Sequence, residues 1–98
     1  MEEEFFIEKI KELHKLQKTK LKLVTNEIYY VISNNIVNDN KIEHLFDDIL
    51  DLYYWFGSKI DPLFDELYNY YKNINNEITK DYKGFFLELK EEDTNEKV

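Results

Sequence analysis

The chain has 98 residues, a length that suits one domain. Its formal net charge of −8, from 21 acidic and 13 basic residues, argues against general binding to phosphate backbones or anionic membranes. It favours a basic partner if there is one, and solubility alone is the alternative explanation of an acidic surface. The absence of cysteine excludes a disulfide framework, a thiolate metal site and a cysteine nucleophile, and no apolar run approaches the ~18 residues of a membrane span.

The first predicted element is an amphipathic helix from about Glu3 to Asn34. Its apolar residues recur at helical spacing on one face, and they are Phe6, Ile10, Leu13, Leu16, Val24, Ile28 and Val31. Gln17 and Lys20 interrupt this face. We therefore expect the helix either to bend at this point or to run past its packing partners.

A turn-rich segment, residues 33–40, precedes the second predicted helix. Asn40 followed by Glu43 resembles a capping box, which predicts that this helix starts near Lys41. Its apolar residues again share one face, and they are Ile42, Leu45, Phe46, Ile49, Leu52, Tyr53 and Phe56. Gly57 is placed to end the helix in a left-handed conformation.

The third predicted helix begins at Pro62, with Asp61 as its N-cap, because proline lacks only a backbone N–H that has no helical partner there. Apolar residues hold one phase as far as Leu89, so the helix continues to about Lys90, unless 73–76 or Gly84 interrupts it. We expect residues 1–90 to form one helical domain and residues 91–98 to form a frayed acidic tail.

These elements predict an all-α fold, a small antiparallel helical bundle. It contains three helices, or four if the first or the last is broken. Short connections set successive helices antiparallel. Because the central helix is the shortest, the outer two are expected to be partly uncovered.

No catalytic motif is apparent, since two isolated glycines make no phosphate-binding loop and no nucleophile stands beside a base in a known pattern. His44 and Asp48 share a helix face, but a carboxylate-bridged metal site would require Glu where Lys41 stands. We therefore expect no enzyme activity, no metal and no cofactor.

A block of six lysines lies between Lys9 and Lys22, opposed there only by Glu12. Three interpretations remain open. In the first, the block contacts nucleic acid, which would act against the negative charge of the whole domain. In the second, it pairs by charge with the acidic second helix, within the chain or in a dimer. In the third, the lysines are simply solvated.

The candidate partner-binding surface is an acidic helix face with aromatic residues at its end. Carboxylates four residues apart repel each other, and their ~6 Å spacing is near that of successive backbone phosphates. Tyrosine and tryptophan beside carboxylates are typical of binding hot spots, although a solvated acidic face and a tryptophan packed under a loop are the alternatives. The candidates are Glu43, Asp47, Asp48, Asp51, Tyr54, Trp55, Asp61, Asp65 and Glu66.

These features favour a small inhibitor or adaptor that blocks a basic, nucleic-acid-binding surface of a host protein, as an anti-CRISPR, anti-defence or DNA-mimic protein would. The alternatives are an immunity or antitoxin-like bundle that neutralises a cationic peptide or toxin, and a structural homodimer. The chain lacks Ala and Arg, which is typical of AT-rich coding sequences and favours a phage or mobile element of a low-GC bacterium. The acidic N-terminus lacks the positive charge of a secretory signal, so we expect a cytoplasmic location in the bacterial host.

Overall fold

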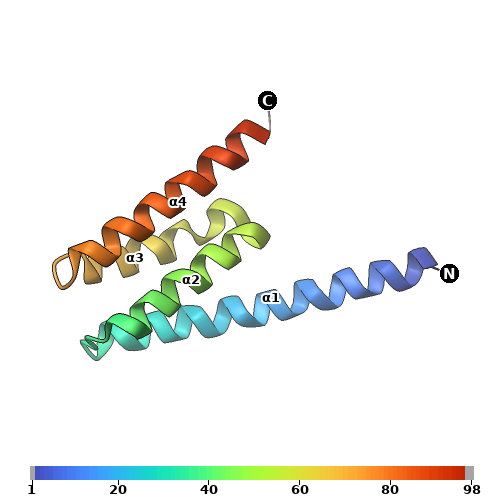
Figure 1. Ribbon diagram of the computed structural model, residues 1–98. Coiled ribbons are helices and arrows are strands. Elements are labelled where there is room, and N and C mark those ends of the chain that lie inside the picture. Colours follow the sequence, from blue (N-terminus) through green and yellow to red (C-terminus); the bar gives the residue numbers. More distant parts are fainter. Residues whose placement is uncertain (1, 97–98) are drawn as a thin grey trace.

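The computed structural model describes residues 2–96, with side chains described for residues 3–92. Its elements are α1 (Glu2–Ser33), α2 (Asp39–Phe56), the 3₁₀ helix η1 (Gly57–Ile60), α3 (Asp61–Tyr71) and α4 (Asn76–Glu96). Successive α-helices run antiparallel (Figure 1), and no strand occurs within residues 2–96. The predicted all-α bundle is confirmed, and it takes the four-helix form because the last predicted helix is divided.

The first helix does not break at the polar gap in its apolar face. α1 continues through Gln17 and Lys20, and Val24, Ile28 and Val31 beyond this gap are buried. The apolar side chains before the gap are exposed, and in Figure 1 the N-terminal half of α1 projects past the other helices. Of the two expectations for this helix, the structure confirms that it runs past its packing partners.

The start of α2 differs from the predicted one. The N-cap is Asn38, whose side-chain oxygen accepts a hydrogen bond from the backbone N–H of Lys41 at 3.1 Å. The helix therefore begins at Asp39, and the capping box predicted for Asn40 and Glu43 is wrong. An asparagine at either position could cap the helix in isolation, and the contacts that the first helical residue makes elsewhere in the fold select Asn38.

Gly57 ends α2, as predicted. Its φ of 57° and ψ of −140° differ from the left-handed helical conformation, but they lie in a region that only glycine adopts easily. In this conformation the Gly57 N–H donates a hydrogen bond to the carbonyl of Tyr53. The chain then continues directly into η1.

Asp61 is not the N-cap of α3. It is the first residue of the helix, the N-cap is Ile60, and no side-chain hydrogen bond caps this end. Pro62 lies in the first turn, where a backbone N–H has no partner within the helix, so the helix loses no hydrogen bond to the proline. The carboxylate of Asp61 instead forms an ion pair with Lys90 of α4.

The predicted third helix is interrupted after Tyr71, at the first of the two expected places. The N–H groups of Ile74 and Asn75 both donate to the carbonyl of Tyr71 at 2.9 Å, which closes a turn, and the side chain of Asn75 then accepts from the N–H of Ile78 at 3.3 Å. Gly84 lies within α4 and does not interrupt it.

The last helix extends further than predicted. α4 continues to Glu96, beyond the end expected near Lys90, so the first part of the expected tail is helical. The remainder of that tail, 97–98, lies outside the described residues.

The core lies around α2 and α3, which contact each other and both outer helices. α1 and α4 do not contact each other within the described residues. Phe64 of α3 joins the layers, because its ring lies 5.4 Å from Phe46 of α2 and stacks at 4.2 Å on Phe86 of α4. Since α2 and α3 pack face to face, their outward faces point to opposite sides of the bundle.

One end of the bundle is held by hydrogen bonds from the end of α3, and from the turn that follows it, to the segment that leads into α2. The hydroxyl of Tyr71 donates to Asp39, which also accepts from the side chain of Asn75 at 3.2 Å, and the hydroxyl of Tyr70 donates to the carbonyl of Ile36 at 2.7 Å. Burial, together with the hydrogen bond to Asp39, raises the pKa of Tyr71 to about 12. The neutral hydroxyl is therefore the form that this contact stabilises.

Candidate functional site

The outward side of α2 holds a row of carboxylates. The buried face of this helix, which includes Ile42, Phe46 and Ile49, turns the intervening positions away from the core. Asp47 and Asp51 are exposed one turn apart, about 6 Å along the axis. We define the α2 face as Glu43, Asp47, Asp48, Asp51, Tyr54 and Trp55.

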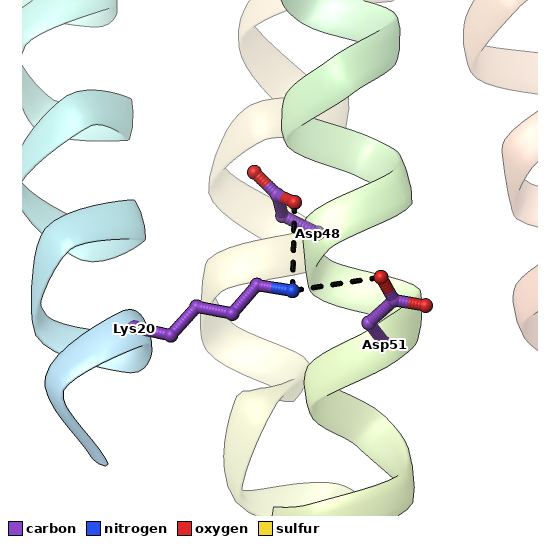
Figure 2. Close-up of polar contacts among 3 residues, drawn as sticks. All are labelled: Lys20, Asp48 and Asp51. Carbon is purple, nitrogen blue, oxygen red and sulfur yellow. Dashed lines mark hydrogen bonds and ion pairs between the residues drawn. The ribbon is translucent and has the colours of Figure 1, made fainter. Parts of the chain in front are cut away.

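A lysine of α1 reaches this row. The Nζ of Lys20 lies 3.6 Å from Asp48 and 3.5 Å from Asp51, and Figure 2 shows it pointing between the two carboxylates. The side chain of Asp51 remains 67% exposed, so its pairing with Lys20 is solvated and weak. Of the predicted lysine block, Lys20 is the residue that forms an ion pair with α2, which supports the intramolecular interpretation for this one lysine.

A tyrosine of α4 meets the row from the opposite flank. The hydroxyl of Tyr82 donates to Asp47 at 2.8 Å, and its ring stacks on Phe46 at 5.0 Å. Burial and the acceptor carboxylate raise the pKa of Tyr82. The neutral phenol orients Asp47 without cancelling its charge, so the face stays negative on this side.

Two large aromatic side chains stand at the C-terminal end of the row. Tyr54 is 72% exposed and Trp55 is 41% exposed. Trp55 lies two turns beyond Asp48, on the flank that faces α1, whereas Tyr54 lies two turns beyond Asp47, on the flank that faces α4. The sequence analysis placed both residues off the buried face, and their exposure agrees with that placement.

The remaining candidates do not join this row. Asp61 pairs with Lys90, while Asp65 and Glu66 are exposed on α3 beside the buried Phe64. Because α2 and α3 pack on each other, the outward sides of the two helices diverge. The structure therefore separates the nine candidate residues into the α2 face and a smaller acidic set on α3.

A second exposed surface lies on the N-terminal part of α1. Large apolar side chains follow the N-terminal part of α1 from its first turns, and the exposed ones before the polar gap are Phe5, Phe6, Ile7, Ile10, Leu13 and Leu16. Two signals pointed to them, the polar gap in the α1 face and the shortness of the second helix.

The described residues offer no metal centre. Among them, no group of three or more His, Asp or Glu side chains is arranged to hold an ion. The ring of His14 instead lies 5.9 Å from that of Phe56, at the end of α2.

None of the described helices is both long enough and apolar enough to cross a bilayer. Comparison of the chain with protein-family models, curated proteins and solved structures found no match.

Proposed function

We propose that the protein is a small binding protein, an inhibitor or adaptor, that docks the α2 face on a basic surface of another protein. The observation that supports this most directly is the exposure of Tyr54 and Trp55 beside the carboxylates of Asp47 and Asp51. Desolvated aromatic anchors contribute most of the affinity of many interfaces, and peripheral charges steer the encounter. The α2 face offers both in two to three turns of one rigid helix.

The geometry supports a protein partner better than imitation of DNA. Asp39, Glu43, Asp47 and Asp51 follow one another at one-turn spacing, but Asp39 accepts hydrogen bonds from Tyr71 and Asn75 and Lys20 partly neutralises Asp51. A mimic of a phosphate backbone would need a longer uncompensated row. The aromatic pair has no role in such mimicry, whereas a protein surface provides apolar pockets for it.

More specifically, we propose that the partner is a nucleic-acid-binding protein of a bacterial host. The protein described here would be encoded by a phage or mobile element and would block that partner, as an anti-CRISPR protein does. A cationic toxin or peptide, neutralised by an immunity or antitoxin-like bundle, would contact the same α2 face. The two partners differ in kind, because the first is displaced from nucleic acid when it binds and the second need not bind nucleic acid at all.

Affinity capture from a nuclease-treated lysate of a low-GC bacterium tests the α2 face with a matched control. Asp47→Lys with Asp51→Lys reverses two charges on α2, and Asp65→Lys with Glu66→Lys reverses two charges on the opposite side of the bundle. We expect a partner that the wild type and the α3 variant retain and that the α2 variant loses. Equal loss in both variants would indicate general attraction to an acidic protein and would contradict the proposal.

With the captured partner purified, Trp55→Ala separates anchoring from steering. As a desolvated anchor, Trp55 should contribute about 2 kcal/mol or more, lost chiefly through faster dissociation, whereas the Asp47 and Asp51 reversals should slow association and reduce its dependence on salt. Tyr29→Ala, which removes an aromatic side chain of similar exposure from α1, is the control. If Trp55→Ala lowers the stability of the fold and leaves binding unchanged, Trp55 is a packing residue and the proposal fails.

A further inference from the structure

Four lysines form a row along the outer side of α1. They follow one another at spacings of four, three and four residues, so they share one face of the helix, and they are Lys11, Lys15, Lys18 and Lys22. This face lies opposite the buried Val24 and Val31, so it points away from the bundle. All four lysines are exposed. We call them the lysine row.

The lysine row has no counter-charge within the described side chains. The other two lysines of the block are engaged elsewhere, because Lys20 reaches carboxylates of α2 and the Nζ of Lys9 lies 5.6 Å from the ring centroid of Phe5. The ion pairs among the described residues include none of the four row lysines. No acidic residue occurs in the sequence between Glu12 and Glu27. Like charges one turn apart repel each other, so an anion bound along the lysine row would relieve this repulsion.

An exposed aromatic side chain continues the same face toward the C-terminal end of α1. Tyr29 lies two turns beyond Lys22 at nearly the same helical phase, and it is 50% exposed. In the other direction the face becomes acidic, because Glu4 and Glu8 precede Lys11 at one-turn spacing. The basic surface therefore begins at Lys11 and extends about 27 Å along the helix to Tyr29.

We propose that the lysine row and Tyr29 bind a single strand of nucleic acid, with phosphates along the lysines and a base stacked on the tyrosine ring. The lysines rise along the axis in steps of about 4.5–6 Å, close to the distance between successive phosphates of one strand. The flexible stem of lysine allows each ammonium group to follow its phosphate. Stacking on an aromatic ring beside a basic track holds unpaired bases of any sequence. Such a site takes single strands without sequence preference.

The local charge of α1, rather than the net charge of the chain, governs this contact at physiological ionic strength. Residues 9–22 contain six lysines and one glutamate, a local charge of +5. Salt screens charges over about 8 Å under these conditions, and the lysine row points away from the bundle that carries most of the carboxylates. The net charge of −8 still repels a polyanion at longer range, so it limits the affinity. We expect a dissociation constant on the order of 100 µM, the weak end of non-specific binding.

Fluorescence anisotropy of a labelled oligothymidylate, titrated with the full chain over about 50–200 mM salt, tests the lysine row. Four phosphate contacts predict that the logarithm of the binding constant falls with that of the salt concentration at a slope of about −3. We expect Lys15→Gln with Lys18→Gln to weaken binding at least about tenfold at the lowest salt and to reduce the slope by about 1.4. Lys72→Gln with Lys80→Gln, at exposed positions of α3 and α4, changes the net charge equally and should alter binding less than about twofold. No binding by the wild type, or equal losses in the two variants, would overturn the proposal.

Two neighbouring tyrosines provide a matched test of base stacking. Tyr29 and Tyr30 are 50% and 55% exposed, but they point about 100° apart around α1, and the Nζ of Lys41 lies 5.9 Å from the ring centroid of Tyr30. We expect Tyr29→Ala to weaken binding of the same oligonucleotide at least about fivefold without changing the salt slope, and Tyr29→Phe to keep wild-type affinity. Tyr30→Ala should change binding little. Equal effects of the two alanine substitutions would contradict a stacked base on Tyr29.

An anionic lipid surface is the competing partner for a row of lysines. The same full-length protein is therefore mixed with vesicles of phosphatidylcholine and phosphatidylglycerol. We expect Lys15→Gln with Lys18→Gln to leave the sedimented fraction unchanged. Co-sedimentation that this variant loses, from a wild type that does not bind the oligonucleotide, would assign the lysine row to a membrane and contradict the proposal. None of these tests requires the partner of the α2 face, so the two proposals can fail separately.

Discussion

Two isoleucines on one face of α1 allow the same substitution to be compared inside and outside the core. Ile28 is fully buried, whereas Ile10 lies in the N-terminal part of α1, ahead of the polar gap, with 47% of its surface exposed. Both occupy interior positions of the same helix, so Ile→Ala changes the backbone preference equally in the two cases. The difference between the two variants therefore measures packing alone.

The expected magnitudes differ widely. Truncation of a fully buried isoleucine costs about 2–5 kcal/mol, through lost burial and the cavity that remains, and a domain of this size has a total stability of about 5–15 kcal/mol. We expect Ile28→Ala to lower the melting temperature by roughly 12–24 °C, taking 3 kcal/mol as the cost. Ile10→Ala should leave it within about 0.5 kcal/mol of wild type, because alanine favours the helix and no packed core is disturbed.

Thermal and urea unfolding followed by circular dichroism measure both variants. The protein concentration is kept at the lowest that the method permits, so that any dimer is dissociated and Ile10 reports on the monomer. A cost above about 1.5 kcal/mol for Ile10→Ala under these conditions would mean that the N-terminal part of α1 packs on its own bundle. Ile10 and its apolar neighbours would then contribute to the core of the monomer.

Two further predictions concern the fold. Alanine substitution of Phe46, Ile49 or Leu67, each fully buried at the α2–α3 centre, should cost about 2–5 kcal/mol in urea unfolding, and a cost below 1 kcal/mol at all three would contradict the core. Tyr71 should make stability pH-dependent, because its pKa is about 12 in the folded state against 10 in the unfolded chain. Its contribution is complete below pH 10 and is lost as the pH rises through 12, at up to about 1.4 kcal/mol per pH unit, and Tyr71→Phe should remove this part of the slope.

The sequence predicted the helices better than their ends, for a physical reason that two residues illustrate. The apolar spacing that forms α2 is local, so Ile42 to Phe56 could be assigned to one helix directly. The N-cap of α2 could not be assigned in this way. Asp39 is positioned by hydrogen bonds from Tyr71 and Asn75, which lie more than 30 residues away in the sequence. Contacts of this range decide between caps that are locally equivalent.

Asp61 shows the same limit. Its position before Pro62 is the usual one for an N-cap, and sequence reasoning assigned it that role. In the structure the carboxylate is engaged by Lys90, from a helix that the sequence analysis expected to be continuous with α3. Once the chain turns back after Tyr71, α4 brings a cation to this site.

The sequence predicted which side chains of the candidate site share a face of one helix, but not which contacts they make with other helices. Spacings within α2 were sufficient to place Asp47, Asp51 and Trp55 off the buried face. The ion pairs of Lys20 and the separation of Glu66 from the α2 face depend instead on how the helices cross. That crossing is set by packing around Phe46 and its neighbours, which no local pattern specifies.

The length of α1 is the feature that local rules explain least. A helical segment of about 11 residues is marginal in water, and most helices gain their stability from a packed apolar face. The N-terminal part of α1, ahead of the polar gap, has such a face, with Phe6 and Ile10 on it, but both side chains are exposed. In a short chain, which buries only about 60–65% of its unfolded surface, apolar side chains kept in water contribute nothing to folding. The apolar side chains before the polar gap therefore add little to the stability of the bundle, in contrast to Val24, Ile28 and Val31 beyond it.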